Sequence, residues 1–513
     1  MLESTTDQTT AATTPVAPVL IAGEEVPSDF APVVNPARTD EIVGEYALGT
    51  ARHVDLAVAA AVAAFGRWSS LTAAERAEYM LRAADRIEEG LAARSVLLTR
   101  EQGKVLWESR LDVGGAPMML RYFASLAEET DRLGEAAVAT SRGNAVLRHV
   151  PVGPVGIITP WNTPVYLAFG AVAPALLAGN TVVVKLPEEV PLALSDTLRL
   201  LAEVLPPGVV SAVPGVGEEA GAALAAHPDI RRLSFTGSIE SGKSVMRNAS
   251  GNLKNLGMEL GGNDPAIVLG DTKISESLMS EFMAAVFSSS GQICYNVKRI
   301  YVERPAYGDF VDAFTETASR IVVGDGLDSR STIGPLTTKA GFDRLLALRE
   351  AATSRGASVR VVGHQLDPAG WDDGYFMLPS IVTGVGARDQ LVTDEQFGPV
   401  IPILPFDRVD EAVAQANDTE YGLAASVWSA DVDRARDVAR RLQAGNVFIN
   451  VHRVGASPME VPFGGMKQSG VGRNHGLRAV KDGMEEQAII DFGDTSHMPG
   501  SREWQDFGPD QQR

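Results

Sequence analysis

The chain has 513 residues, enough for about three domains of ordinary size. Hydrophobic and charged residues make up 45% and 21% of it, which is typical of a folded protein and argues against extensive disorder. Acidic residues outnumber basic ones by 65 to 45, and the resulting formal charge of −20 argues against nucleic acid or an anionic membrane surface as the partner.

The N-terminal segment carries no recognisable targeting pattern. Residues 1–16 are polar and rich in Thr, which predicts a disordered tail. The first basic residue is Arg38, so neither a signal peptide nor an Arg-rich transit peptide is indicated. No apolar run reaches the roughly 20 residues that span a bilayer. We therefore expect a soluble protein of the cytoplasm.

Alternating helical and strand patterns follow. Helices are predicted at 54–65 and after Thr72, which has the spacing of a capping box with Glu75. From residue 150 onwards, we expect strands at 155–159, 181–185, 209–213 and 232–235, with helices ending at 176–179 and covering 195–204. This spacing predicts parallel βαβ units, whose ligands bind beyond the carboxyl ends of the strands.

A second series of the same kind predicts a second α/β domain. It begins with strands at 266–269 and 299–302 around a helix at 275–288, and continues with strands at 381–383, 401–404, 424–427 and 447–450. The final residues 495–513 are polar and contain Gly and Pro, which predicts an exposed tail.

Three residues are candidates for chemistry. Cys294 is the only cysteine, which excludes an intrachain disulfide and a metal site built from several cysteines, although a lone cysteine is more often a small buried residue. Glu259 has Met, Leu and two Gly as neighbours, which favours a buried carboxyl with a raised pKa, suited to a general base, over a charge exposed at a strand end. The amide of Asn162, which follows a predicted strand, either donates to a developing oxyanion or caps a turn.

Two further segments are candidates for a cofactor, although the usual dinucleotide fingerprint Gly-x-Gly-x-x-Gly after a strand is missing. Gly237, Ser238 and Gly242 lie at a strand-to-helix junction, where main-chain N–H groups either hold a phosphate oxygen or begin an ordinary helix. Lys185 ends another strand and Glu188 follows it. A carboxylate there accepts hydrogen bonds from ribose hydroxyls and repels a 2′-phosphate, although a solvated ion pair has the same pattern.

Together these segments resemble the NAD(P)-dependent aldehyde dehydrogenase superfamily, in the family's order and over roughly residues 20–490. The matching segments are Pro160-Trp161-Asn162, Lys185 with Glu188, Phe235-Thr236-Gly237-Ser238, Glu259-Leu260-Gly261-Gly262, Gly291-Gln292-x-Cys294 with Arg299, Glu395-Gln396-Phe397-Gly398-Pro399-Val400, Asn417-Asp418-x-x-Tyr421-Gly422-Leu423 and Pro462-Phe463-Gly464-Gly465-x-Lys467-x-Ser469-Gly470. The lone cysteine falls at the family's nucleophile position. Four positions depart from the common pattern without removing a catalytic group: Pro187 is shifted by one, and Asn263, Ser289 and Asn474 replace a lysine, an asparagine and a glutamate.

The resemblance implies the oxidation of an aldehyde to a carboxylic acid. The Cys294 thiolate attacks the aldehyde carbon to give a thiohemiacetal, whose oxyanion the Asn162 amide and the Cys294 N–H stabilise. Loss of hydride to the nicotinamide leaves a thioester, and Glu259 activates the water that hydrolyses it. We expect NAD rather than NADP as the cofactor, because Glu188 disfavours a 2′-phosphate, and no metal.

The resemblance also implies which residues contact the cofactor. The expected contacts are Lys185 and Glu188 at the adenine ribose; Gly237 and Ser238 at the pyrophosphate, supported by Gly221 and Gly242; Glu395 at the nicotinamide ribose and Phe397 beside the ring; and, in addition, Thr159, Trp161, Phe235 and Leu260.

The substrate is less defined. Thr163 and Gly170 stand where many relatives have aromatic residues, which predicts a wide entrance and favours a bulky or aromatic aldehyde. The remaining expected pocket residues are largely apolar: Tyr166, Leu167, Phe287, Ile293, Tyr295 and Phe463. His452 and Arg453 either bind the carboxylate of a semialdehyde or face solvent or a subunit contact.

The fold implied by the resemblance is α/β, with a Rossmann-like cofactor domain, an α/β catalytic domain and a small β oligomerisation arm. The expected intervals are 17–132 and 151–258 for the NAD-binding domain, 259–482 for the catalytic domain, and 133–150 with 483–494 for the arm. Residues such as Ala145, Leu147 and His149 are compatible with a strand of that arm. Such arms build homodimers or homotetramers, and the sequence does not distinguish the two.

Three other functions remain open. A cysteine hydrolase or acyltransferase would normally use a histidine partner, and none of the seven histidines lies in these motifs. A CoA-acylating relative would transfer the acyl group to CoA, which the water-activating Glu259 argues against. A non-catalytic scaffold would have no need to keep Cys294, Glu259 and Asn162.

Overall fold

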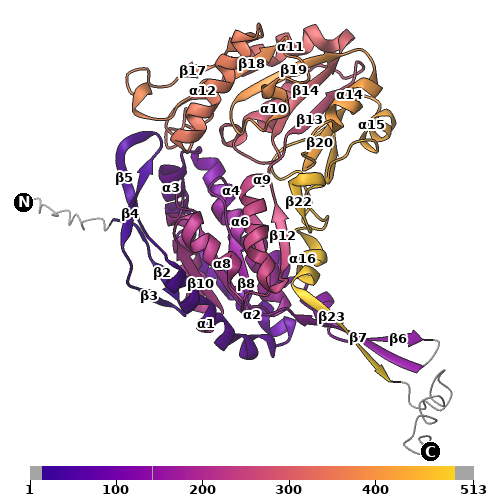
Figure 1. Ribbon diagram of the computed structural model, residues 1–513. Coiled ribbons are helices and arrows are strands. Elements are labelled where there is room, and N and C mark those ends of the chain that lie inside the picture. The colour runs from indigo at the N-terminus through magenta and orange to yellow at the C-terminus, as the bar shows by residue number, and fades with distance from the viewer. Residues whose placement is uncertain (1–13, 141–142, 492–513) are drawn as a thin grey trace, which may run out of the picture.

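Two lobes, each built on a largely parallel sheet with helices against its faces, make up the body of the molecule (Figure 1). The computed structural model describes residues 14–140 and 143–491. Within these ranges, no helix combines the length and the apolar character needed to cross a membrane. The α/β fold predicted from the sequence is confirmed.

The first lobe is organised around an eight-stranded sheet with the strand order β22-β12-β11-β8-β9-β10-β2-β3. Its parallel centre consists of β8 (Val155–Ile158), β9 (Val182–Leu186), β10 (Val210–Pro214), β11 (Arg232–Thr236) and β12 (Asn255–Glu259), while the antiparallel β2 (Val19–Ile21) and β3 (Glu24–Val26) extend one edge. The four strands predicted in this region are confirmed to within one residue. β8, β9 and β10 are buried throughout, which explains why their sequences are continuous apolar runs.

Helices cover this sheet. They are α1 (Ala51–Ser69), α2 (Ala73–Glu88), α3 (Leu91–Gln102), α4 (Leu106–Ala124), α5 (Ala127–Arg132), α6 (Pro164–Ala178), α7 (Leu192–Val204), α8 (Ala222–Ala226) and α9 (Ile239–Ala249). The predicted capping box at α2 is confirmed, because Glu75 N donates to Thr72 Oγ1 at 3.1 Å and Thr72 N donates to the Glu75 carboxylate at 2.7 Å. Met80 of α2, Phe123 of α4 and Phe169 of α6 are buried in one core with the sheet.

A small N-terminal sheet was not foreseen. It joins β1 (Val16–Ala17), β5 (Arg38–Ala47) and β4 (Phe30–Asn35). Val16, assigned to the tail, begins β1 because it pairs in parallel with Glu45 of β5. Residues 1–13 of the predicted tail lie outside the described residues.

The second lobe contains a seven-stranded sheet with the order β16-β18-β19-β14-β13-β20-β21. Its strands are β13 (Asp264–Val268), β14 (Val297–Glu303), β16 (Ser358–Val361), β18 (Ser380–Thr383), β19 (Val400–Phe406), β20 (Ala424–Trp428) and β21 (Asn446–Ile449), with β15 (Val322–Val323) and β17 (His364–Gln365) paired beside it. Its helices are α10 (Glu276–Phe287), α11 (Arg304–Ala318), α12 (Lys339–Ser354), α13 (Gln390–Thr393), α14 (Val409–Asn417) and α15 (Val432–Ala439). The strands and the helix predicted for this region are confirmed, with β13 and β14 each beginning two residues earlier and β19 ending two residues later than expected.

The C-terminal part of the chain returns to the first lobe (Figure 1). β22 (Gly470–Val471) pairs antiparallel with β12 and so joins the sheet of the first lobe, although its residues were assigned to the interval 259–482 of the predicted catalytic domain. After α16 (Gly476–Asp482), β23 (Met484–Asp491) pairs with β7 (Gly143–Pro151), which pairs with β6 (Ala136–Thr140). This three-stranded sheet projects from the body where the arm was predicted. Residues 492–494 of the predicted arm and the tail 495–513 lie outside the described residues.

Candidate active site

Four neighbouring parallel strands bring most of the candidate residues to one edge of the first sheet. In the order β12, β11, β8 and β9, each strand ends at a segment singled out from the sequence. Glu259 ends β12, Ser238 follows β11, Asn162 follows β8, and Lys185 and Glu188 stand at the end of β9. Because the carboxyl ends of parallel strands meet at one edge, groups far apart in the sequence share this edge.

The second lobe supplies the nucleophile to the same place. Cys294 is partly exposed and lies in the loop between the 3₁₀ turn η3 (Ser288–Gly291) and β14. The Asn162 Nδ2 amide donates a hydrogen bond of 2.9 Å to the main-chain oxygen of Gln292, two residues before the thiol. The predicted amide donor and the predicted nucleophile are therefore brought together across the two lobes.

The surroundings of Cys294 are rich in carboxyl groups. Burial, together with Glu395, Asp264 and Glu259, raises the pKa of the thiol to about 12, and the ammonium group of Lys298 acts in the opposite direction. These surroundings favour the neutral thiol over the thiolate. Forming the thiolate requires a positive charge or a proton acceptor close to the sulfur.

Glu259 has the environment of a general base. It is only 9% exposed, and its Oε2 has no hydrogen-bond partner among the described residues. Burial raises the pKa of Glu259 well above its ordinary value, opposed by the charge of Arg473. Space for the carboxyl group depends on Gly464, because a Cβ added there would come within 2.8 Å of Glu259 Oε1. The buried environment inferred from its apolar neighbours is confirmed, and the strand-end exposure is not found.

A buried ion pair fixes the loop that carries Asn162. The Lys104 ammonium donates to the main-chain oxygen of Asn162 at 2.7 Å and to Asp112 at 2.8 Å, and both charged side chains are at most 2% exposed. Asp112 also accepts the main-chain N–H of Tyr166 at 2.7 Å, in the first turn of α6. Asn162 itself is 4% exposed. These contacts hold the amide donor in one orientation, and the sequence analysis did not identify Lys104 or Asp112.

On the cofactor side, Lys185 and Glu188 form an ion pair of 2.7 Å. Lys185 is buried, whereas Glu188 is half-buried and also accepts the main-chain N–H of Gly217 at 3.3 Å. Thr159 connects the neighbouring strand, because its hydroxyl donates to the main-chain oxygen of Lys185 at 3.0 Å. The Glu188 carboxylate therefore lies at the strand end in a position to accept ribose hydroxyls.

The start of α9 offers main-chain donors for a phosphate. Ser238 is its N-cap and accepts the N–H of Ser241 at 3.1 Å. Gly237 and Gly242 are required by close packing, because an added Cβ would come within 2.6 Å of the Phe235 ring and within 2.7 Å of the Leu260 side chain, respectively. Gly221, in the π-helical turn η1 (Gly217–Gly221), has no such neighbour within 4 Å.

Glu395 and Phe397 lie on the other side of the crevice. Glu395 Oε1 accepts the N–H of Gly262 at 3.3 Å, and burial raises the pKa of Glu395 to about 7 against the charge of Lys298. Phe397 has a left-handed backbone with φ of 53°, and its ring meets Trp161 edge to face at 5.5 Å. Contacts from both lobes thus bring these two predicted cofactor residues next to the nucleophile loop.

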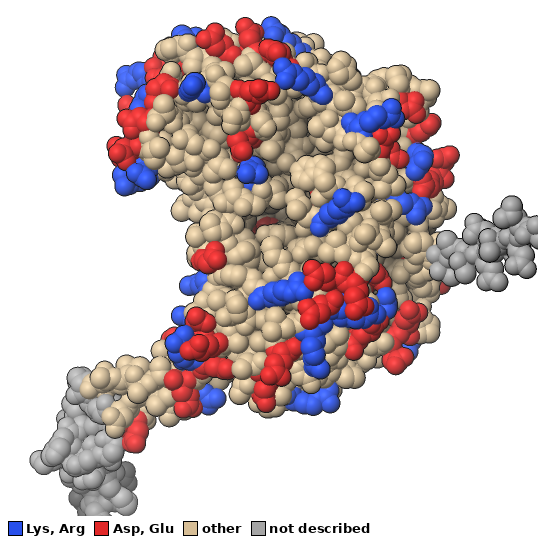
Figure 2. Space-filling model, turned by 180° about the vertical axis from the view of Figure 1, so that it is seen from behind, with Lys and Arg blue, Asp and Glu red and all other residues tan. Residues whose placement is uncertain are grey.

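Most of the predicted substrate residues come from α6, from the nucleophile loop and from the segment after β21. Thr163, Tyr166 and Leu167 are partly exposed at the start of α6, and an added Cβ at Gly170 would meet no atom within 4 Å. Tyr295 and Phe463 meet edge to face at 5.4 Å, and Ile293 is 6% exposed. In space-filling view, the waist between the lobes is hollowed and largely free of charged side chains, with acidic atoms at the floor of the hollow (Figure 2).

Phe287 does not lie where it was predicted. It is 2% exposed and belongs to the core of the second lobe, where its ring lies 6.0 Å from that of Phe314. The position ends α10, and its side chain packs among the buried apolar residues of that lobe.

His452 and Arg453 are already engaged by protein groups. His452 is fully buried, with Nδ1 2.9 Å from Ser426 Oγ and Nε2 2.8 Å from the main-chain oxygen of Tyr295. Arg453 is exposed and pairs with Glu281 at 3.0 Å. Of the alternatives for these residues, solvent exposure describes Arg453; His452 does not face solvent and instead supports the main chain at Tyr295.

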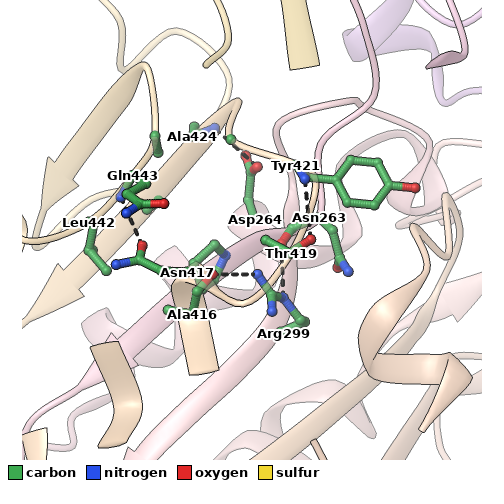
Figure 3. A pocket seen from close by; sticks show the side chains of 14 residues that line it. Asn263, Asp264, Arg299, Ala416, Asn417, Thr419, Tyr421, Ala424, Leu442 and Gln443 are labelled. Atoms are coloured by element: carbon green, nitrogen blue, oxygen red, sulfur yellow. Dashed lines mark hydrogen bonds between the residues drawn. The ribbon is translucent and has the colours of Figure 1, made fainter. Parts of the chain in front are cut away.

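A small cavity of about 10 Å³ lies behind the site (Figure 3). Arg299 closes it, donating to the main-chain oxygens of Asn263 at 2.9 Å and Ala416 at 3.1 Å. Asn263, which departs from the family pattern, donates to the main-chain oxygens of Val392 and Thr393 and so helps to place the turn before Glu395. This volume holds about one water molecule, so the cavity is part of the packing and not a substrate site.

Comparisons with known proteins agree with this geometry. Residues 23–489 match the sequence profile described as the Aldehyde dehydrogenase family. The chain belongs to the aldehyde dehydrogenase family. It is 37% identical over 461 residues to retinaldehyde dehydrogenase 3 of Rattus norvegicus, covering 89% of this chain and 88% of the relative. It is 35% identical to the chloroplastic betaine aldehyde dehydrogenase of Beta vulgaris, covering 93% and 95%.

Solved structures agree with the fold of this member of the family. The betaine aldehyde dehydrogenase of Staphylococcus aureus in complex with NAD⁺ is 32% identical, with a TM-score of 0.88 over 93% of this chain and 95% of that one. The residues of this chain fit such a dinucleotide: a half-buried carboxylate at a strand end, main-chain donors at the start of α9 and a second carboxylate at Glu395.

Proposed function

We propose that this aldehyde dehydrogenase oxidises an aldehyde to the carboxylic acid with NAD⁺ through a Cys294 thioester. The observation that best supports this reaction is that groups from both lobes interact with Cys294 and its loop. The Asn162 amide lies within hydrogen-bond distance of the cysteine loop, and the buried Glu259 carboxyl acts on the thiol electrostatically. The proposed nucleophile, amide donor and base come from three separate segments, and these two interactions connect them.

The first step falls to Cys294 and Asn162. The thiolate sulfur forms a bond to the aldehyde carbon, and the carbonyl oxygen becomes an oxyanion. The Asn162 amide, held by Lys104 and Asp112, and the main-chain N–H of Cys294 stabilise that charge. Bound NAD⁺ would supply the hydride acceptor, and loss of hydride from the tetrahedral carbon would leave a thioester of Cys294.

The second step falls to Glu259. Its unpartnered Oε2 accepts a proton from water, and the resulting hydroxide adds to the thioester carbon and releases the Cys294 sulfur. A raised pKa makes Glu259 a stronger base than an exposed carboxylate once it is ionised. This base supports hydrolysis over transfer to CoA. A cysteine hydrolase is less well supported, because both ring nitrogens of the buried His452 are already within hydrogen-bond distance of Ser426 and Tyr295.

We propose Lys185 and Glu188 for the adenine ribose, Ser238 for the pyrophosphate and Glu395 for the nicotinamide ribose. The negative charge of Glu188 at the ribose position would repel a 2′-phosphate, which supports NAD⁺ over NADP⁺.

The proposed substrate is a bulky or aromatic aldehyde. Gly170 leaves open space where a side chain would stand, and Thr163 is small, so the entrance is wide on the α6 side. Tyr166, Tyr295 and Phe463 give the pocket aromatic walls. A semialdehyde is less well supported, because Arg453 is paired with Glu281.

We further propose that the chain divides into the cofactor domain, catalytic domain and arm expected from the sequence, and that the arm builds a homodimer or homotetramer. β6 is exposed along its whole length, and Ile489 and Ile490 of β23 are 47% and 58% exposed. Apolar side chains on a projecting sheet are typical of strands that pack against another chain. Sedimentation of the purified protein distinguishes the assemblies. The proposed location is the cytoplasm, which fractionation of the native cells tests.

The function is tested by NADH absorbance. We expect NADH formation with NAD⁺ and an aldehyde in the absence of CoA, and a kcat/KM ranking that favours aromatic over short aliphatic or carboxylated aldehydes. Gly170→Phe should lower kcat/KM for the aromatic substrate roughly tenfold or more, because the ring fills the open space, with a smaller effect on a short aldehyde. A strict CoA requirement, or hydrolysis without cofactor, would contradict the proposal.

A further inference from the structure

A buried lysine, which neither the motifs nor the proposed mechanism uses, lies beneath the nucleophile. Lys298, in β14, is 2% exposed. Its ammonium donates to the main-chain oxygens of Gly291 at 2.9 Å and Ile293 at 2.7 Å. Both acceptors belong to the segment that leads to Cys294, so a single ammonium group fixes two main-chain oxygens of this segment.

That loop has an unusual backbone. Ser289, Ser290 and Gly291 are consecutive residues with left-handed φ angles of 50°, 56° and 78°. Side-chain-bearing residues rarely adopt this conformation, so it persists only where surrounding contacts impose it. The buried Glu108 accepts the N–H of Ser289 at 2.7 Å at the start of the loop, and Lys298 holds its end.

The charges around the thiol make the ammonium important for a second reason. Carboxyl groups face Cys294 from β12 (Glu259), β13 (Asp264) and the segment before β19 (Glu395), and all three oppose ionisation of the thiol. Burial lowers the pKa of Lys298 and Arg344 acts in the same direction, whereas Glu395 and Asp264, two of the three carboxyl groups, favour its charged form. The Phe397 ring lies 5.4 Å from the ammonium, which excludes water on that side.

We propose that Lys298 is a positioning residue for the nucleophile. Its ammonium fixes the carbonyls of Gly291 and Ile293 so that the thiol keeps one orientation, and its charge offsets the three carboxyl groups when the thiolate forms. The inference rests on the proposed role of Cys294 and adds the group that sustains it.

The chain contains a matched control. Lys254 is also buried, 8% exposed, and its ammonium also donates to two main-chain oxygens, those of Ala225 at 2.6 Å and His227 at 2.9 Å. These acceptors lie at the end of α8 and just after it, away from the thiol. Lys298→Met and Lys254→Met therefore remove the same chemical group from the same kind of environment, and only the first change lies at the site.

The experiment measures the rate at which iodoacetamide alkylates the full-length protein without cofactor, as a function of pH. The thiolate sulfur forms the new bond to carbon and iodide leaves. Because Cys294 is the only cysteine, the rate reports this thiol alone. We expect Lys298→Met to react about tenfold more slowly at each pH below the thiol pKa, Lys298→Arg to recover much of the rate, and Lys254→Met to match the wild type, even if both methionine variants unfold at a lower temperature.

A Lys298→Met profile that superimposes on the wild-type profile would overturn the proposal, as would an equal loss in Lys254→Met. If Lys298→Met does not fold, Lys298→Gln removes the charge and keeps one donor, and the same slowing is expected of it. The readout needs no aldehyde turnover. A wild-type protein that produces no NADH therefore refutes the proposed function, while the alkylation comparison decides the role of Lys298 separately.

Discussion

The two sides of the crevice are built differently. On the cofactor side, the candidate polar groups are satisfied: Lys185 pairs with Glu188 at 2.7 Å, and the Ser238 hydroxyl caps α9. On the nucleophile side, Glu259 Oε2 and Asp264 Oδ2 are buried without a hydrogen-bond partner in the described part of the chain. The residues before Cys294 also have left-handed backbones.

This difference shows that the nucleophile side contains features that lower the stability of the fold, whereas the candidate groups of the cofactor side do not. A buried unpartnered carboxyl oxygen and a left-handed residue other than glycine each cost about 1–3 kcal/mol. Such features persist only if the rest of the fold supports them. We therefore expect changes on the nucleophile side to alter turnover by orders of magnitude, and changes on the cofactor side to alter mainly the choice of cofactor.

The largest effect is expected for Cys294→Ala, which removes the nucleophile. Turnover should fall on the order of 10⁴-fold or more, because no other thiol is present to replace it. NAD⁺ affinity, measured by calorimetry, should stay close to that of the wild type, since Lys185, Glu188 and Ser238 are untouched. Turnover near the wild-type rate would refute the assignment of the nucleophile.

Glu259→Gln comes next and should slow the hydrolysis of the thioester by about 10²–10⁴-fold. Stopped-flow absorbance should show a burst of NADH followed by a slow steady rate. The wild-type kcat should fall on the acid side as the raised pKa of Glu259 is passed and the base becomes protonated, whereas the variant should lose this limb. A variant with an unchanged steady rate would show that another group activates the water.

Glu259→Gln should also raise the free energy of unfolding at neutral and alkaline pH. Burial raises the pKa of Glu259, so the folded state holds this proton more tightly than the unfolded chain and loses stability as the pH rises from the ordinary carboxyl pKa towards the raised value. Glutamine removes this cost. Thermal unfolding at pH 8 should therefore occur at a higher temperature in Glu259→Gln, and a lower unfolding temperature would contradict it.

Asn162→Ala should lower kcat by about 10²–10³-fold, because it removes a donor to the oxyanion. KM for the cofactor should change little. The variant also loses the bond to Gln292, so its alkylation profile serves as the control: a profile like that of the wild type assigns the loss of kcat to the oxyanion rather than to a displaced loop.

The smallest effect is expected on the cofactor side. Glu188→Ser should raise kcat/KM for NADP⁺ roughly tenfold, because it removes the negative charge that faces a 2′-phosphate. NAD⁺ should lose a modest part of its affinity. If the variant still does not use NADP⁺, residues other than Glu188 determine the choice of cofactor. That result would also weaken the contrast between the two sides.

The sequence predicted the residues that act by their own chemistry. The parallel strands of both sheets are apolar runs of recognisable length, and their carboxyl ends locate Asn162, Lys185, Ser238 and Glu259. Cys294 was identifiable because it is unique and its motif is specific.

Residues that act through the main chain were not predictable. Lys104 and Lys298 matter because of the carbonyls that they reach, and those carbonyls are defined only after folding. For the same reason, Phe287 was misplaced: an aromatic residue next to a catalytic motif has no signature that separates the pocket from the core. The pairing of β22 with the first sheet could not be predicted either, since a strand of two residues has no recognisable sequence pattern.

That pairing has a consequence for biosynthesis. β12 is complete once residue 259 has left the ribosome, yet the last two residues of its outer edge pair with residues 470–471. At typical elongation rates, the roughly 200 intervening residues take on the order of 10–40 s to synthesise. During this interval the nascent first lobe presents an unpaired strand edge, which is a template for aggregation. Slow translation or truncation before residue 470 should therefore make the nascent chain depend more strongly on chaperones.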